Sequence, residues 1–243
     1  MEIEKSENGQ PIYRYDNIEK AAFTPAHGDA DSIEAISNHI EKYIGKIEMV
    51  FHEIVSDKVH IDVFWIKPTE KFPFNTFITS GMSDMPMNVP DGYEAYQHAE
   101  LCILLPIDWE INEEAFNDEN NYWPIRWLKL IARLPHDYNN WVGYGHTIPN
   151  GENAAPLSEQ TKLGCLMLLS CYTFGEEFEQ LQINPEKSIN FYSLVPLYKE
   201  EMEYKLKKGT NELLKKFDKN GVSDIVDLNR KNTCLKKGLF GLW

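Results

Sequence analysis

The feature that most limits the fold of this chain is a series of short, strand-like segments. Apolar residues occupy every second position from Val59 to Trp65, which is the two-residue period of a β-strand. Ser56-Asp57 supplies a turn before this segment, and residues 74–80 and 99–105 have a similar composition. Because strands joined by short connections pair most easily as antiparallel neighbours, we expect an antiparallel meander rather than parallel strands joined by helices.

Helices are predicted on both sides of this series. Isoleucines recur at helical spacing from Ile33 to Ile44, Asp31 with Glu34 predicts a capping box at the start, and Gly45 ends the helix. A second helix is predicted with Pro124 in its first turn and Pro135 at its end. The other predicted elements are an apolar strand or helix at 163–172, a strand at 189–195, and helices at 197–208 and 210–219 separated by Gly209.

These elements predict one α+β domain over residues 29–228, with a mostly antiparallel or mixed sheet and helices packed against it. Residues 1–28 are polar and contain Pro11, Pro25 and Gly28, so we expect an N-terminal arm with little regular structure. Residues 229–243 are basic and contain glycine, which is typical of a flexible C-terminal tail.

The charge of the chain limits its partners. It has 24 Lys and Arg against 38 Asp and Glu, a net charge of −14. Residues 199–243 hold 11 basic and 7 acidic residues, so residues 1–198 hold 13 basic and 31 acidic residues and carry a net charge of −18. An acidic body repels nucleic-acid phosphates and anionic lipids and attracts basic proteins. We therefore expect a basic protein partner, and neither nucleic acid nor a membrane.

The cysteines and the N-terminus predict a cytoplasmic protein. Cys102, Cys165 and Cys171 lie in apolar segments, and the four cysteines form no C-x-x-C pair, which is typical of buried thiols in a reducing compartment. The first residues lack the apolar segment of a secretory signal. No stretch approaches the roughly 18 consecutive apolar residues of a transmembrane helix.

The motifs of catalysis, of cofactor binding and of metal binding are missing. His136 and His146 are the nearest metal candidates, but their spacing matches no known ligand pattern, and hydrogen-bonded structural histidines are the simpler explanation. Gly143 and Gly145 lack the third glycine of a dinucleotide loop, and G-x-S-x-G is absent. We therefore predict no catalytic residue, no cofactor-binding residue and no metal site.

Two surface-forming segments could instead bind a partner. The first is an acidic loop or short helix, for which a solvated face is the ordinary explanation and a docking surface for a basic protein the alternative. The second is rich in aromatic residues, which occur both in cores and in binding hot spots. The predicted partner-binding residues are Asp108, Trp109, Glu110, Glu113, Glu114, Asp118 and Glu119 in the first segment, and Tyr138, Trp141, Tyr144 and His146 in the second.

Several segments, in their order and spacing, resemble the Suppressor of fused family. They are residues 100–106, which end in Leu105-Pro106, then Asp108-Trp109, Trp123-Pro124-Ile125 leading to Leu128, residues 132–136, residues 141–148 with Gly145-His146-Thr147, and residues 195–202. The resemblance covers roughly residues 28–228, and the combination of these segments is more specific than any one of them.

The resemblance implies a Suppressor of fused-like α+β fold and a role in binding proteins rather than in catalysis. Animal members clamp a short peptide of a transcription factor, whereas bacterial members resemble immunity proteins of polymorphic toxin systems. The chain is too short for the two-lobed animal architecture, so the bacterial role is the one carried over. A basic toxin domain would suit the acidic charge, because nuclease toxins that grip phosphate are often basic.

Three hypotheses follow. The first is an immunity protein, or antitoxin, that neutralises a cognate toxin by direct binding. The second is an adaptor that captures an extended segment of a partner at a sheet edge. The third is an enzyme that uses His136, His146 and a carboxylate, but no nucleophile motif and no cofactor-binding loop supports it.

Overall fold

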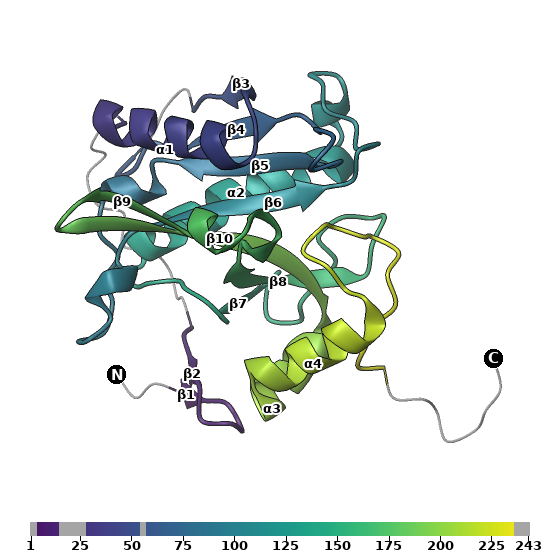
Figure 1. Cartoon of the computed structure of the whole chain (residues 1–243). Coiled ribbons are helices and arrows are strands. Elements are labelled where there is room, and N and C mark those ends of the chain that lie inside the picture. Colours follow the sequence, from purple (N-terminus) through teal and green to yellow (C-terminus); the bar gives the residue numbers. More distant parts are fainter. Residues whose placement is uncertain (1–3, 15–27, 54–56, 236–243) are drawn as a thin grey trace, which may run out of the picture.

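The computed structural model describes residues 4–14, 28–53 and 57–235. Within them, eight strands form one mixed sheet (Figure 1). Its order is β3 (Ile47–Phe51), β4 (Asp62–Ile66), β5 (Asn75–Ser80), β6 (Ala99–Leu105), β10 (Lys187–Tyr198), β8 (Leu163–Ser170) and β7 (Thr147–Pro149), while β9 (Gln180–Asn184) pairs with β10. The predicted meander is confirmed, because β3 to β6 follow one another as antiparallel neighbours. The sheet is mixed because β10 pairs with β6 in parallel.

Helices cover both faces of the sheet. In Figure 1, α1 (Ala30–Tyr43) lies in front of the strands and α2 (Glu119–Asp137) behind them. Alternate residues of β6 therefore enter two cores: Leu101 and Ile103 pack in the cluster that contains Trp123 of α2, and Leu104 packs in the cluster that contains Ile40 of α1. All seven residues of β6 are buried, and each large apolar side chain contributes roughly 1.5–3 kcal/mol.

The C-terminal part forms a third, smaller core. Helices α3 (Lys199–Lys208) and α4 (Thr210–Asn220), with Gly209 between them, lie where they were predicted. They pack on β8 and β10 through a cluster that includes Met167, Leu213 and Phe217. The chain then returns to the sheet, where the Val226 amide donates to the Leu104 carbonyl at 2.8 Å.

The N-terminal segment differs from the expected unstructured arm. β1 (Glu4–Lys5) pairs with β2 (Pro11–Ile12) in a short hairpin. The turn of this hairpin contacts α3, since the Asn8 amide donates to the Leu206 carbonyl at 3.3 Å. Part of the expected arm, residues 15–27, lies outside the described residues.

Two predicted helix starts are wrong. The cap of α1 is Asp29 rather than Asp31, which lies in the first turn. Helix α2 begins at Glu119, so Pro124 lies inside the helix rather than in its first turn, and Pro135 does not end it. The side chain of Asp118 accepts a hydrogen bond from the Asn120 amide at 2.9 Å, and this cap starts the helix more than a turn before the proline.

The strand expected from Val59 begins three residues later. Asp62 pairs with Ser80, the last residue of β5, and Gly81 then turns the chain away. Residues before Asp62 therefore have no partner on β5, although Val59 and Ile61 remain buried. The ambiguous segment at 163–172 is a strand, β8.

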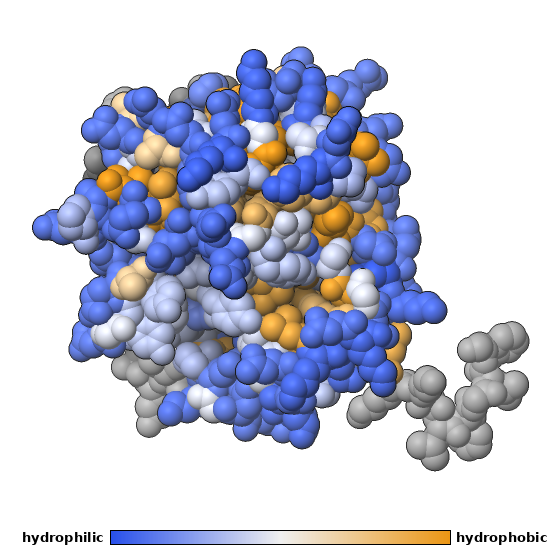
Figure 2. Space-filling model, in the orientation of Figure 1, coloured by the Kyte–Doolittle hydropathy of each residue, from blue (hydrophilic) through white to orange (hydrophobic). Residues whose placement is uncertain are grey.

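Figure 2 shows that hydrophilic residues dominate the periphery of the α1 face, while apolar residues gather near its middle.

Candidate protein-binding surface

Helix α2 separates the predicted partner-binding residues into two groups. The acidic segment ends at the start of α2, and the aromatic segment begins at Tyr138, directly after its last residue. The helix has 19 residues, and at about 1.5 Å per residue it spans roughly 28 Å. The two segments therefore form two separate surfaces rather than one.

The acidic segment is a surface loop with one short helical turn at Ala115–Asn117. Asp108, Glu110, Glu113 and Glu114 are exposed, and none of these carboxylates takes part in an ion pair with another described residue. Their charges are therefore uncompensated locally and available to a cationic partner.

A pocket of about 430 Å³ lies at the start of α2 and contains two of the predicted residues. Asp118, Glu119 and Glu159 bring three carboxyl groups to its wall. Arg126 pairs with Glu119 at 2.5 Å, and Asp118 is held by the capping hydrogen bond. Because one arginine offsets only one of the three carboxylates, the pocket is acidic, and a lysine or arginine side chain suits its charge.

Trp109 does not belong to this exposed surface. Its Nε1 donates to the Asn121 carbonyl at 3.1 Å, and its ring meets that of Trp123 edge-to-face with 6.1 Å between centroids. These contacts fix the loop to α2. Trp109 is therefore a structural anchor of the acidic segment.

The aromatic segment contributes to a row of rings in which Trp141 and His146 are partly buried and two tyrosines are exposed. The ring of Trp141 lies 4.5 Å from that of His146 and 5.5 Å from that of Tyr93, which in turn lies 6.0 Å from Tyr96. We call Tyr96, Tyr93, Trp141 and His146 the aromatic row. Tyr93 is 47% exposed and Tyr96 43%. Tyr144, which is 48% exposed, lies in the same segment as Trp141 and His146.

Tyr93 and Tyr96 were not predicted as site residues. They lie in a loop between β5 and β6, far in sequence from the Gly-rich aromatic segment. Two tyrosines three residues apart, directly after Pro90-Asp91-Gly92, could have indicated exposed rings. Asp91 and Glu94 are exposed in the same loop, so the row has an acidic border.

The two histidines of the enzyme hypothesis have different structural roles. Burial lowers the pKa of His146 to about 4, and the nearby Lys205 ammonium acts in the same direction, so the ring is neutral near pH 7. His136 hydrogen-bonds through Nε2 to the Met82 carbonyl at 3.0 Å, and burial lowers its pKa as well. Among the described residues, one group of three side chains is close enough together to hold a metal ion: His52, His60 and Asp62. Neither His136 nor His146 belongs to it.

Three of the four cysteines are buried, as predicted for the apolar segments, and Cys234 is partly exposed. Cys102, Cys165 and Cys171 are fully buried, and burial raises the thiol pKa of Cys165 and of Cys171. The sulfur atoms of Cys102 and Cys171 lie 3.0 Å apart within the core on the α1 side. Protonated, buried thiols are poor nucleophiles.

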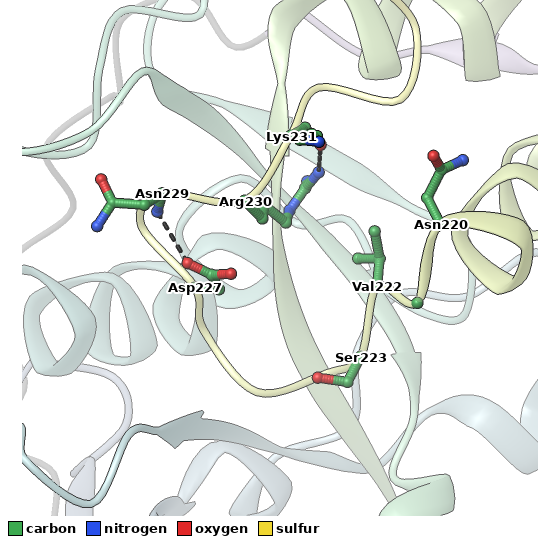
Figure 3. Close-up of a pocket in the computed structure, with 8 residues that line it drawn as sticks. Asn220, Val222, Ser223, Asp227, Asn229, Arg230 and Lys231 are labelled. Atoms are coloured by element: carbon green, nitrogen blue, oxygen red, sulfur yellow. Dashed lines mark hydrogen bonds between the residues drawn. The ribbon is translucent and has the colours of Figure 1, made fainter.

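A second pocket, of about 320 Å³, lies after α4 and contains none of the predicted residues (Figure 3). Its wall includes Ser223, Asp227, Asn229 and Arg230. Both terminal nitrogens of Arg230 bind the buried Glu201 carboxylate, so this guanidinium is already paired. The other charged residues of its wall, Asp227 and Lys231, have opposite signs, so the pocket carries little net charge.

Comparison with known proteins shows which family has this architecture. The family described as Suppressor of fused protein (SUFU) matches residues 57–231, which is more than half of the chain. The chain belongs to the Suppressor of fused family. The predicted resemblance and the Suppressor of fused-like α+β fold are thereby confirmed.

Relatives of this Suppressor of fused domain come from bacteria and animals. An uncharacterized protein of Ureaplasma parvum is 26% identical over 84% of this chain and 96% of its own length. The crystal structure of a putative Suppressor of fused homologue from Neisseria gonorrhoeae has a TM-score of 0.65 and 19% identity, and the match covers 86% of this chain and all of that one.

Two further solved structures share the fold at lower similarity. A chain of the Sufu–Fu complex has a TM-score of 0.59 and 16% identity over 83% of this chain and 92% of its own. Drosophila Suppressor of Fused has a TM-score of 0.55 and 15% identity, and the match covers 87% of this chain but 52% of that one. Among the described residues, no helix is long and apolar enough to cross a membrane.

Proposed function

We propose that this Suppressor of fused domain is a non-catalytic, cytoplasmic immunity protein that neutralises a cognate toxin by binding it directly. The observation that carries the proposal is the aromatic row with its acidic border. Two exposed tyrosines in contact, Tyr93 and Tyr96, with Tyr93 against the partly buried ring of Trp141, are typical of interface hot spots. The Sufu–Fu complex adds support, since that relative was solved together with a protein partner.

The charge of the chain favours a basic toxin. The net charge of −18 over residues 1–198 favours a basic partner, such as a toxin domain that binds nucleic acid. The four exposed carboxylates of the acidic segment and the pocket at Glu119 would meet basic side chains of that domain. The aromatic row would supply affinity, and the acidic segment would speed the encounter.

Co-expression tests this proposal. The chain is produced together with the polypeptide encoded beside its gene, and cell survival and co-purification are scored. We expect survival and a stable complex. Death of the cells with no complex would count against an immunity role.

The acidic segment is tested separately by replacing its four exposed, unpaired carboxylates, Asp108, Glu110, Glu113 and Glu114, with lysine. We expect slower association with the toxin and a weaker dependence of the association rate on salt. Replacing Lys215 and Lys219 of α4 with glutamate is the control, because it alters surface charge elsewhere. An unchanged rate and an unchanged salt dependence in the lysine variant would exclude the acidic segment from the interface.

Stoichiometry separates neutralisation by binding from the enzyme hypothesis. An inhibitor that binds must be present in at least equal amount to the toxin, whereas an enzyme using His136 or His146 would inactivate a large excess. We expect toxin activity to fall linearly and to vanish at a ratio of one to one. Complete inactivation at far lower ratios would show catalysis.

A second candidate function is a peptide-binding adaptor. The observation in its favour is the edge strand β3, which pairs with β4 alone among the described strands. An extended peptide could add to such an edge through backbone hydrogen bonds. Slower amide hydrogen exchange in β3 on addition of a linear partner peptide would support the adaptor, and a partner bound only as a folded domain would count against it.

A further inference from the structure

Three ligand-type side chains meet where the edge hairpin β3–β4 ends. The Nδ1 atom of His52 lies 2.9 Å from Oδ2 of Asp62, and Nε2 of His60 lies 3.1 Å from Oδ1 of the same carboxylate. All three ligand atoms lie within 4.8 Å of one another. The strand register explains the meeting: Phe51 pairs with Val63, so the next residue, His52, faces Asp62. His60 precedes Asp62 by two positions, which favours the same side of the chain.

Two imidazoles and one carboxylate are a donor set for a divalent metal of borderline softness. Zn²⁺ bonds to such ligands at about 2.0–2.1 Å, so ligand atoms of a tetrahedral site lie roughly 3.3 Å apart. The two separations to Asp62 are a few tenths of an ångström shorter than that value and reach different oxygens of the carboxylate, so one imidazole must turn for both rings and one oxygen to hold the same ion. The His52 side chain is 71% exposed, so it can turn toward the other two without disturbing the core.

The surroundings hold the carboxylate in place. Asp62 is buried, and its Oδ1 accepts a hydrogen bond from the Glu53 amide at 3.2 Å. Such outer contacts orient metal ligands and strengthen binding. Charges of both signs lie near: Arg133 pairs with Glu53, Lys129 interacts electrostatically with Asp62, and Asp84 with His60. The charges of Asp84 and Glu53 thus offset those of the two cations.

We infer that His52, His60 and Asp62 form a Zn²⁺ site with its fourth position open to water or to a donor atom of a partner. The site lies at the edge strand, on neither the acidic segment nor the aromatic row. It is therefore independent of toxin neutralisation. The alternative is a purely structural cluster in which one carboxylate accepts hydrogen bonds from two imidazoles.

Calorimetric titration of the metal-free full chain with zinc chloride separates the two. We expect one Zn²⁺ per chain, and a loss of affinity of at least about ten-fold in His52→Ala and in His60→Ala. His52→Ala is the decisive variant, because its exposed side chain can be removed without unfolding the domain. Glu48→Gln, which alters an exposed carboxylate on the neighbouring strand β3, is the control and should bind like the unaltered chain.

Two other metal ions test the geometry and the ligand type of the site. Co²⁺ in place of Zn²⁺ should give the intense visible absorption of a tetrahedral site, and His52→Ala should remove it. Mg²⁺ should not compete, because it prefers an all-oxygen octahedral site. Absence of zinc binding, or binding that is unchanged in both histidine variants, would overturn the inference and leave a hydrogen-bonded cluster.

Discussion

Gly81 has no room for a side chain. Its φ is +118°, and a Cβ there would lie 1.9 Å from the His60 carbonyl oxygen. Its amide also donates to Oε1 of the fully buried Glu100 at 3.0 Å. We expect Gly81→Ala to lower the free energy of unfolding by more than about 4 kcal/mol, since both the backbone and this hydrogen bond must shift.

The matched control is Gly92→Ala. Gly92 also has a positive φ, +85°, but nothing lies within 4 Å of its Cβ position. We expect a loss of about 1 kcal/mol, from backbone strain alone. The difference between the two variants in the free energy of urea unfolding measures the clash of the added Cβ with the His60 carbonyl. Similar losses in both variants would show that the close approach at Gly81 does not exist.

His146 gives the protein a defined sensitivity to acid. Its pKa is about 4 in the folded chain against 6.5 for a free side chain, so the unfolded chain binds the proton more readily. The stabilisation is therefore complete above about pH 6.5 and is lost as the pH falls toward 4. We expect His146→Gln to remove up to about 3 kcal/mol of this pH dependence.

The free energy of unfolding of both proteins, measured by chemical unfolding at neutral pH and again between about pH 4 and pH 6.5, tests this prediction. His39, His98 and His136 also have pKa values lowered by burial, but they are present in both proteins and their effect cancels. A gap between the two proteins that does not change with pH would show that the His146 ring is protonated as easily when folded.

At the level of elements, one ion pair holds the C-terminal segment to α3. Glu201 is fully buried and binds Arg230 through both carboxylate oxygens, at 2.7 Å and 2.5 Å, and the Thr233 amide donates to it at 2.9 Å. The Arg230 guanidinium also lies over the rings of Tyr198 and Phe217. We propose that the domain extends past residue 228, because Arg230 and Thr233 both contact its buried core.

Arg230→Ala would leave the Glu201 charge buried and unpaired. We expect a loss of about 3–5 kcal/mol in the free energy of unfolding. Lys231→Ala, next to it and exposed, should change stability by less than about 0.5 kcal/mol. Thermal or urea unfolding of both variants measures this, and equal stability would mean that residues 229–235 do not pack on α3.

Elements were predictable where the period of apolar residues was clear. The isoleucines of α1 and the alternation around β4 and β6 follow from side chains that must face one of two cores. The start of α2 was not predictable from Pro124, because the Asp118 cap dominates over the preference of proline for a first turn. Tyr93 and Tyr96 of the aromatic row and the three side chains of the proposed zinc site were missed for another reason: their partners lie in other segments, which the fold brings next to them.

At the level of the whole molecule, the −18 charge of residues 1–198 should control association with a basic toxin. Screening shortens the reach of charge to about 10 Å at 0.1 M salt. We expect the association rate to fall steeply as salt rises, while the dissociation rate changes little. Stopped-flow mixing measures both, and a rate that does not depend on salt would show that charge does not steer the encounter.

The binding role of the aromatic row is best measured by the affinity of the purified chain for its cognate toxin domain, with Tyr93→Ala compared against Tyr172→Ala. Both tyrosines are about half exposed, at 47% and 52%, but Tyr172 lies outside the row. We expect Tyr93→Ala to raise Kd by about 30-fold, as for a hot-spot residue, and Tyr172→Ala to leave it unchanged. Equal affinity of the two variants would contradict a binding role for the aromatic row.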